Sequence, residues 1–396
     1  MSAHALYLHV PFCKSKCPYC DFVSFATRRD DPLMEAYINS LAFQIGEAAE
    51  AGLLEAPATA YIGGGTPSYA GESIVGLASR TASLGSLSEL TLEANPESLT
   101  FDLSMMLRES GVSRLSIGVQ SLDDAELSAL GRAHDAKTAR QALNRAVELG
   151  FDVSADLMCA IPLQTSSSWL DTLEGVLATG VSHVSVYPLM IEEGTAFARA
   201  VEAGEQVAPD DGDEALRMEE AEAVLSSYGF ARYEVASYAK EGHNCLHNRA
   251  YWTGISYLGL GTGAASMFGR EDFPALACAF PQLGMPPADA ARIRLSCTTD
   301  RTYLAAHPAL SEQSFEVEYL SLRESLAEDL MLGTRMSCGI SPTLVSRARD
   351  VMGAQLDDCL SGLIADGYLV ESLAPTRRGW LLGNELYGRL WELSSG

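Results

Sequence analysis

Short runs rich in β-branched residues alternate with longer segments of helical periodicity over the first half of this 396-residue chain. Such an alternation is typical of parallel strands that are joined by crossover helices. The runs that we interpret as strands are LYLHV (6–10), TAYIG (59–63), ELTLEAN (89–95), RLSIGV (114–119), DVSADLM (152–158) and HVSVYPL (183–189). The segments with apolar residues at three- and four-residue spacing are 33–50, 71–84, 101–110, 136–149 and 166–179. We therefore expect an α/β fold built on one parallel sheet.

These elements are enough for a partial (β/α)6 barrel, which we expect to occupy residues 1–195. In folds of this kind the chemistry gathers at the carboxyl ends of the strands, and the unusual residues of this chain follow those ends. A second region, residues 196–315, extends the barrel. It contains a helix at about 211–228, a strand-like run at 231–239 and a Gly- and Pro-rich stretch at 259–289 that we interpret as a turn-heavy connection.

A third region, residues 316–396, carries three helical patterns and ends in YLVES and GWLLGNELYGRLWEL. We expect a small helix-rich domain, in which helices followed by a β-hairpin resemble a winged helix. A DNA-binding winged helix would need basic residues, and this tail has few. The net charge of −25 also repels phosphate backbones and anionic lipid. We therefore expect no nucleic-acid partner.

The sequence also bears on the compartment of the protein. No run of apolar residues approaches the roughly 20 needed to cross a bilayer. The N-terminus has no basic segment before its apolar stretch and no small-residue cleavage site. We expect a cytoplasmic protein without a transmembrane segment.

Three of the nine cysteines cluster in CKSKCPYC, at Cys13, Cys17 and Cys20, in a predicted loop between the first strand and the first helix. Three thiolates on a short loop can bind three irons of a [4Fe-4S] cluster and leave the fourth iron open to a small molecule. Zinc is the alternative metal, and it would need a fourth ligand, for which His9 is a candidate. We expect the other six cysteines, which are scattered, to be buried apolar residues.

The spacing C-x3-C-x2-C after a first strand, in a predicted β/α barrel, resembles the radical S-adenosylmethionine superfamily. The resemblance extends along nearly the whole chain. It implies that the amino and carboxylate groups of S-adenosylmethionine chelate the open iron. It also implies that one electron from the cluster cleaves the sulfonium to a 5′-deoxyadenosyl radical.

Two further motifs agree with this superfamily. GGGTP (63–67) follows the second strand, and its glycines let backbone amides approach a ligand closely; the resemblance assigns Gly64, Gly65 and Thr66 to the amino group of the cofactor. Glu93, at the end of the third strand, is a carboxylate on an otherwise apolar strand, where burial is costly without a partner. We expect these four residues to bind the cofactor.

Other candidates for cofactor contact follow later strands or lie near the cysteines. Gln120 ends the fourth strand, Arg132 follows it in LGRAH, and Asp156 lies on the fifth strand. A guanidinium suits the methionine carboxylate, and a carboxylate suits the two ribose hydroxyls. Tyr7 and Tyr19 match positions of the superfamily that contact the cofactor, and one of the two could stack on adenine. Packing in the core is the alternative role of both tyrosines.

The motifs YLHVPFC, YIGGGTPS, RLSIGVQS and LGRAH are similar to one branch of the superfamily. That branch contains oxygen-independent coproporphyrinogen III oxidase and the HemW family of haem chaperones. The oxidase carries a fourth cysteine two residues after the third, and a long N-terminal segment. Here that position is Phe22, and only twelve residues precede Cys13. Both differences favour the chaperone family.

The segment HNRAYW (247–252) matches the H-N-x-x-Y-W motif of the chaperones. Imidazole is a common axial ligand of haem iron, which makes His247 the first candidate for haem contact. Tyr251 and Trp252 would offer flat apolar surface to a macrocycle. The alternative is a packed histidine with an aromatic pair.

The resemblance implies a haem chaperone that binds a [4Fe-4S] cluster, S-adenosylmethionine and haem. Its partner would be a haem-accepting protein, for which a respiratory protein is one candidate, and a homodimer is an arrangement that this interpretation allows. The competing hypothesis is an oxidoreductase of porphyrin chemistry, either oxygen-independent coproporphyrinogen III oxidase or another radical S-adenosylmethionine enzyme that modifies porphyrins.

Overall fold

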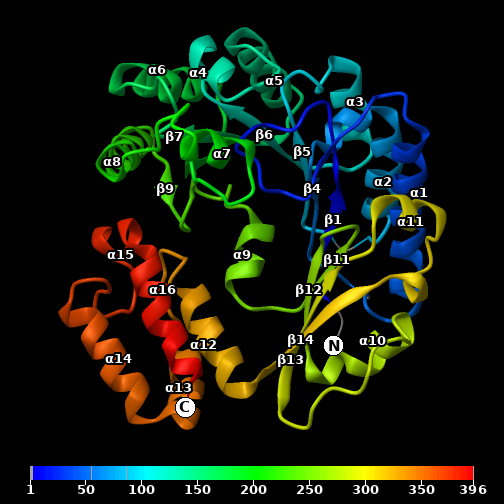
Figure 1. Cartoon of the computed structure of the whole chain (residues 1–396), viewed down its shortest axis with the longest axis vertical. Helices are drawn as coiled ribbons and strands as arrows, with labels where there is room; N and C mark the ends of the chain where they lie inside the picture. Colours follow the sequence, from blue (N-terminus) through cyan, green and yellow to red (C-terminus); the bar gives the residue numbers. More distant parts are fainter. Residues whose placement is uncertain (1–2, 55, 86, 396) are drawn as a thin grey trace.

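A twelve-stranded sheet forms the framework of the protein, and Figure 1 shows helices around it. The computed structural model describes residues 3–54, 56–85 and 87–395. The strand order is β14-β13-β12-β11-β1-β4-β5-β6-β7-β8-β10-β9. Six neighbouring strands are parallel: β1 (Ala5–Val10), β4 (Thr59–Gly64), β5 (Glu89–Ala94), β6 (Arg114–Gln120), β7 (Asp152–Cys159) and β8 (His183–Pro188). Each predicted strand agrees with one of these within one residue at either end, so the predicted parallel sheet is confirmed.

Helices join the parallel strands on the outer face of the barrel. They are α1 (Pro32–Glu50), α2 (Glu72–Ala82), α3 (Phe101–Glu109), α4 (Asp124–Ala129), α5 (Ala136–Glu148) and α6 (Ser166–Leu177). Five begin at a side chain that accepts a hydrogen bond from the first turn, as the N-cap Asp31 does for α1. The five predicted helices are present. The predicted helix at 71–84 is preceded by a 3₁₀ turn, η1 (Pro67–Ala70), and α4 was not predicted.

The second region extends the sheet at both edges. Its elements are α7 (Ala196–Glu202), α8 (Asp211–Ser227), β9 (Ala231–Arg232), β10 (Ser237–Ala239), α9 (Leu246–Trp252), β11 (Tyr257–Leu260), β12 (Ala265–Gly269), η2 (Arg270–Asp272), α10 (Phe273–Ala279), β13 (Ala290–Cys297), α11 (Arg301–Ala306), η3 (Leu310–Glu312) and β14 (Phe315–Ser321). β10 pairs antiparallel with β8, and β11 pairs parallel with β1. Both ends of the parallel sheet are therefore covered by strands from this region.

Two predictions for this region were wrong. The single strand expected at 231–239 is a hairpin, because the chain turns at Glu234 and the N–H of Tyr233 donates to the carbonyl of Ser237. The connection expected at 259–289 contains β12, η2 and α10 and the end of β11. Gly259 is there because β12 runs so close that a Cβ at that position would lie 2.1 Å from the carbonyl oxygen of Ala265. The glycine marks close strand packing and not a turn.

The C-terminal helices form a second core and lie apart from α1–α6 in Figure 1. They are α12 (Leu322–Gly333), α13 (Pro342–Met352), α14 (Ala354–Ala365), α15 (Arg377–Leu381) and α16 (Gly383–Trp391). The hairpin expected after the first three is reduced to one antiparallel bridge, between Leu369 and Pro375. Residue 316, where we expected this region to start, lies inside β14, and residues 1, 2, 55, 86 and 396 of the predicted regions fall outside the described residues. Across the described ranges, no helix combines the length and hydropathy needed to span a membrane.

Candidate functional site

A cavity of about 390 Å³ lies inside the barrel and reaches the carboxyl ends of the parallel strands. All of the predicted site residues line it except Tyr7 and His247. The members are Cys13, Cys17, Tyr19, Cys20, Gly64, Gly65, Thr66, Glu93, Gln120, Arg132 and Asp156. The structure thus brings together, at one cavity, residues spread over more than 140 positions of the sequence.

The three clustered cysteines stand on one loop at the edge of this cavity. The loop is framed by two short paired strands, β2 (Phe12–Cys13) and β3 (Phe25–Ala26). Burial raises the pKa of the Cys13 and Cys20 thiols. The hydroxyl of Thr66 donates to Sγ of Cys13 at 3.6 Å. Among the described side chains, no three His, Cys, Asp or Glu are already gathered as metal ligands; the three thiols face one cavity without converging.

Of the other cysteines, three are buried as expected, and two are exposed contrary to expectation. Cys159, Cys245 and Cys297 are buried, Cys359 is partly buried, and Cys278 and Cys338 are exposed.

His9 is not free to complete a zinc site. Its Nδ1 shares a hydrogen bond with the hydroxyl of Tyr7 at 2.9 Å, and its Nε2 bonds the carbonyl oxygen of Val23 at 2.8 Å. Tyr7 in turn packs beside the ring of Tyr61, with centroids 6.2 Å apart. Tyr7 therefore holds His9 and lies behind the cavity wall, which matches the packing role left open for it.

The glycine-rich segment passes so close to the cysteine loop that side chains would not fit. Gly64 has a φ of +117°, and a Cβ on it would lie 2.7 Å from the His9 ring. A Cβ on Gly65 would lie 2.8 Å from the backbone nitrogen and oxygen of Phe12 and 3.0 Å from Sγ of Cys13. These glycines set the position of the cysteine loop against the second parallel strand.

Two buried carboxyl groups face the cavity from neighbouring parts of the wall. Glu93 accepts hydrogen bonds from the Tyr61 hydroxyl at 2.8 Å and the Gly64 N–H at 2.9 Å. Asp156 accepts from the Ser116 hydroxyl, at 2.8 and 3.1 Å, and from the Ser154 hydroxyl at 3.1 Å. Burial raises the pKa of Glu93 to about 7 and that of Asp156 to about 6. Both groups can gain or lose a proton near neutral pH, and both favour a ligand with donor groups or positive charge.

Arg132 crosses from the loop after α4 toward the cysteines. Its Nη2 donates to Oδ1 of Asn95 at 2.6 Å and to the carbonyl of Gly118 at 2.9 Å, and its Nη1 lies 3.7 Å from Sγ of Cys17 and 3.5 Å from the Tyr19 hydroxyl. Its buried Nε has no hydrogen-bond partner among the described residues. An open N–H on a buried cation suits a carboxylate ligand.

Asn95, which was not among the predicted site residues, joins the two halves of this wall. Besides accepting from Arg132, its Nδ2 donates to the hydroxyl of Thr66 at 3.0 Å. Its place directly after the third strand, two residues beyond Glu93, was a signal that could have identified it. Ser116 and Ser154, which hold Asp156, were missed because a small polar residue on a strand is usually read as solvent-facing.

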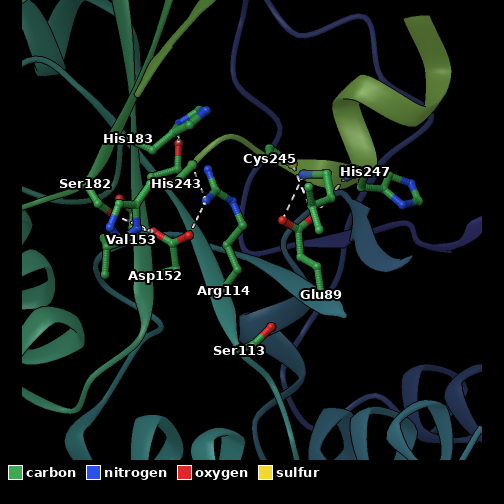
Figure 2. A network of polar contacts seen from close by, with 12 residues as sticks. Glu89, Ser113, Arg114, Asp152, Val153, Ser182, His183, His243, Cys245 and His247 are labelled. Atoms are coloured by element: carbon green, nitrogen blue, oxygen red, sulfur yellow. Dashed lines mark hydrogen bonds and ion pairs between the residues drawn. The ribbon is translucent and has the colours of Figure 1, made fainter. Parts of the chain in front are cut away.

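A second polar network lies at the opposite, amino ends of the strands (Figure 2). Nη1 of Arg114 pairs with Asp152 at 3.0 Å, and Nδ1 of His243 lies 3.1 Å from the same carboxylate. Glu89 accepts from the N–H groups of Leu246 and His247, at 2.9 and 3.0 Å. This carboxylate therefore satisfies the first N–H groups of α9 and stabilises that helix against the barrel.

His247, the first candidate for haem contact, is packed in this structure rather than presented to the cavity, as in the alternative that the sequence left open. It is 1% exposed, its Nδ1 bonds the Thr59 hydroxyl at 2.9 Å, and its Nε2 bonds the Tyr251 hydroxyl at 3.1 Å. Burial lowers its pKa to about 3. Trp252 donates to Glu234 at 3.1 Å. In this conformation neither nitrogen of His247 is available to a metal, because both already have hydrogen-bond partners.

Comparison with known proteins agrees with this geometry. The model of the Radical SAM superfamily matches residues 7–176. The chain is similar to the heme chaperone HemW of Bacillus subtilis, with 30% identity over 96% of this chain and 97% of that protein. It is also similar to the bovine mitochondrial radical S-adenosyl methionine domain-containing protein 1, with 39% identity over 67% of this chain; the match spans only 60% of the bovine protein.

Among solved structures, the chain is similar to coproporphyrinogen III oxidase (HemN) from Escherichia coli. The TM-score is 0.74, and the match covers 99% of this chain and 90% of the other. At 20% sequence identity this likeness shows a common fold, including the mixed sheet and its helices.

Proposed function

The chain belongs to the radical SAM superfamily and, within it, to the family of the heme chaperone HemW, and from this premise we propose that it binds haem and delivers it to acceptor proteins. In this proposal the protein also holds a [4Fe-4S] cluster and S-adenosylmethionine. Cys13, Cys17 and Cys20 would hold the cluster. When bound, the cluster and its ligand supply one-electron chemistry.

The observation that carries the proposal is the single cavity shared by the three thiols and the buried polar groups around them. Arg132 lines this cavity, and its buried Nε–H, which has no hydrogen-bond partner among the described residues, would suit the carboxylate of S-adenosylmethionine. Glu93 and Asp156 favour its ammonium group and its ribose hydroxyls. Three cysteines on one loop fit a cluster that keeps one iron open.

The haem part of the proposal is supported by family membership and by the mouth of the cavity. Phe22 and Met190 line the cavity yet stay 61% and 59% exposed. An aromatic and a polarisable apolar side chain at the mouth offer surface to a flat macrocycle. His247 would reach haem only if α9 moved.

The experiment is a haemin titration of anaerobically reconstituted protein, with and without S-adenosylmethionine. We expect about four irons per chain, a Soret band on haem binding, and transfer of haem to apomyoglobin. Cys17→Ala should lose the cluster, whereas the matched Cys338→Ala, at an exposed position, should retain it. Failure to bind haem, or conversion of coproporphyrinogen III to protoporphyrinogen with turnover, would overturn the chaperone assignment.

His247→Ala adds a second arm to this titration. An unchanged Soret band would identify His247 as a packing residue, as its hydrogen bonds indicate. A shifted band would show that α9 leaves its place when haem binds.

A further inference from the structure

A chain of buried hydrogen bonds runs from the carboxyl group of Asp156 to the start of α9. The Ser154 hydroxyl lies 3.1 Å from Asp156 and 2.8 Å from Nδ1 of His183. Nε2 of His183 lies 2.9 Å from the Tyr233 hydroxyl, which accepts from the N–H of Cys245 at 3.2 Å. All five residues line or adjoin the barrel interior, and His183 and Ser154 are each 1% exposed.

The chemistry of these groups determines which partner donates in each hydrogen bond of this chain. An ionised Asp156 only accepts, so the Ser154 hydroxyl donates to it and accepts from His183. Burial and the nearby Arg114 lower the pKa of His183, so its ring is neutral and carries one proton. That proton lies on Nδ1, and Nε2 then accepts from the Tyr233 hydroxyl. Every donor points toward Asp156, beginning with the N–H of Cys245.

The opposite direction is less favourable. If Asp156 were protonated and donated to Ser154, the ring proton of His183 would move to Nε2 and donate to Tyr233. The Tyr233 oxygen would then accept from both His183 and Cys245, and its own O–H would have no acceptor among the described residues. A buried hydroxyl without an acceptor costs free energy. An ionised Asp156, which cannot donate to Ser154, therefore favours the full set of bonds at Tyr233.

The end of the hydrogen-bond chain that is distant from Asp156 lies where α9 meets the C-terminal helices. Cys245 is the N-cap residue of α9. The carbonyl of Tyr233 accepts from the N–H of Ser337 at 3.0 Å, and Glu234 pairs with Met336 through an antiparallel bridge. Glu234 also accepts from the indole of Trp252 at 3.1 Å. Tyr233 thus touches the barrel through its hydroxyl and the C-terminal region through its backbone.

We propose that Ser154, His183 and Tyr233 form a directional relay that couples occupation of the Asp156 site to the docking of α9 and the C-terminal helices. Tyr233 is the positioning residue of this relay. A ligand that stabilises ionised Asp156 strengthens the docking of α9 against the barrel. Docking of α9 in turn raises the affinity for the ligand by the same factor, because the coupling of two sites is reciprocal. Naming S-adenosylmethionine as that ligand rests on the proposed function.

Hydrogen–deuterium exchange of residues 245–252 tests the relay in ligand-free protein. Tyr233→Phe keeps the ring and removes the hydroxyl; we expect exchange there to be about fivefold faster, as expected for one lost hydrogen bond. Tyr238→Phe is the matched control, since the Tyr238 hydroxyl bonds Arg232 outside the relay. Equal exchange at 245–252 in the two variants would overturn the assignment of Tyr233.

A second pair of variants tests the other end of the relay without relying on the cofactor. Asp156→Asn should change exchange at residues 245–252, whereas Glu126→Gln, at a buried carboxyl that bonds Ser121 outside the relay, should not. If Asp156→Asn left residues 245–252 unchanged, the relay would be wrong even if the cofactor bound.

Exchange measurements with S-adenosylmethionine distinguish a failure of the relay from a failure of the proposed function. S-adenosylmethionine should slow exchange at residues 245–252 in the parent and not in Tyr233→Phe. Failure of S-adenosylmethionine to bind the parent would contradict the proposed function and leave the relay to be judged by Asp156→Asn. Nitrogen-15 spectra of the histidines supply an independent check: we expect His183 protonated at Nδ1, and a proton on Nε2 would overturn the direction of the chain.

Discussion

Nη2 of Arg132 donates to Oδ1 of Asn95 across 2.6 Å, which ties the loop after α4 to the end of the third parallel strand. Asn95 in turn receives its position from Thr66, next to the cysteine loop. A guanidinium held in this way presents its remaining N–H, on Nε, in a fixed direction. The consequence is that charge alone is not sufficient at this position; the planar geometry matters as well.

Arg132→Lys should therefore weaken S-adenosylmethionine binding although it keeps the positive charge. A lost charge-assisted hydrogen bond corresponds to roughly a tenfold to hundredfold loss of affinity. Anaerobic calorimetry measures the change. Arg349→Lys, at an exposed arginine bonded to Asp357, is the control, and equal affinities in the two variants would show that Arg132 does not bind the cofactor.

Gly65→Ala should lower the iron content after reconstitution. The new Cβ would lie 2.8 Å from the backbone of Phe12 and 3.0 Å from Sγ of Cys13, so the cysteine loop must shift. We expect a loss of stability of about 1–3 kcal/mol, as for other overpacked sites, together with loss of cluster. Gly76→Ala is the control, because a Cβ there meets nothing within 4 Å. Full iron and sulfide content in Gly65→Ala would contradict the close contact.

The parallel sheet could be predicted because its strands are buried on both faces and read as apolar runs with clear ends. The cysteines, Glu93, Arg132 and Asp156 were also predictable, since unusual residues stand at strand ends. The inward orientation of Ser116, Ser154 and His183 could not be predicted. They alternate with apolar residues along their strands, and that pattern is the same for a solvent-facing side and for a polar barrel interior.

His247 illustrates what a motif leaves undetermined. The sequence identifies HNRAYW but cannot show whether the imidazole faces a cavity, and the partners of the ring come from far away in the chain. Thr59 is 188 residues earlier. The glycines at 259–263 show the same limit, because a glycine that permits close strand packing and a glycine in a turn look alike in sequence.

His247→Ala should destabilise the protein without affecting the cluster. The substitution removes a buried ring and leaves the Thr59 and Tyr251 hydroxyls without their partner. We expect a loss of about 2–4 kcal/mol in the free energy of unfolding, measured by urea denaturation. Iron and sulfide content should equal that of the parent, and a stability within 0.5 kcal/mol of the parent, roughly the range of surface substitutions, would refute this packing role.

From the two cavity carboxyl groups, Glu93 and Asp156, we expect opposite effects of pH on the stability of the ligand-free protein and on its affinity for a cationic ligand. The pKa of Glu93 is raised from 4.5 to about 7 and that of Asp156 from 3.8 to about 6, both by burial. Because the folded protein then binds more protons than the unfolded chain, these groups lower the stability of the ligand-free protein as pH rises from about 4 to 7. Urea unfolding of Glu93→Gln/Asp156→Asn should lack this contribution.

Binding of a cationic ligand should change in the other direction. The ammonium and sulfonium groups of S-adenosylmethionine favour ionised carboxylates, so its affinity should increase between pH 6 and pH 8, by at most about tenfold per pH unit for each group that must lose a proton. In Glu93→Gln the increase should be weaker and should be centred near the pKa of Asp156, about 6. Calorimetry at several pH values measures both curves. An affinity in the parent that is the same at pH 6 and pH 8 would mean that neither carboxyl group meets the ligand, since a group in contact with a cation cannot release its proton without changing the affinity.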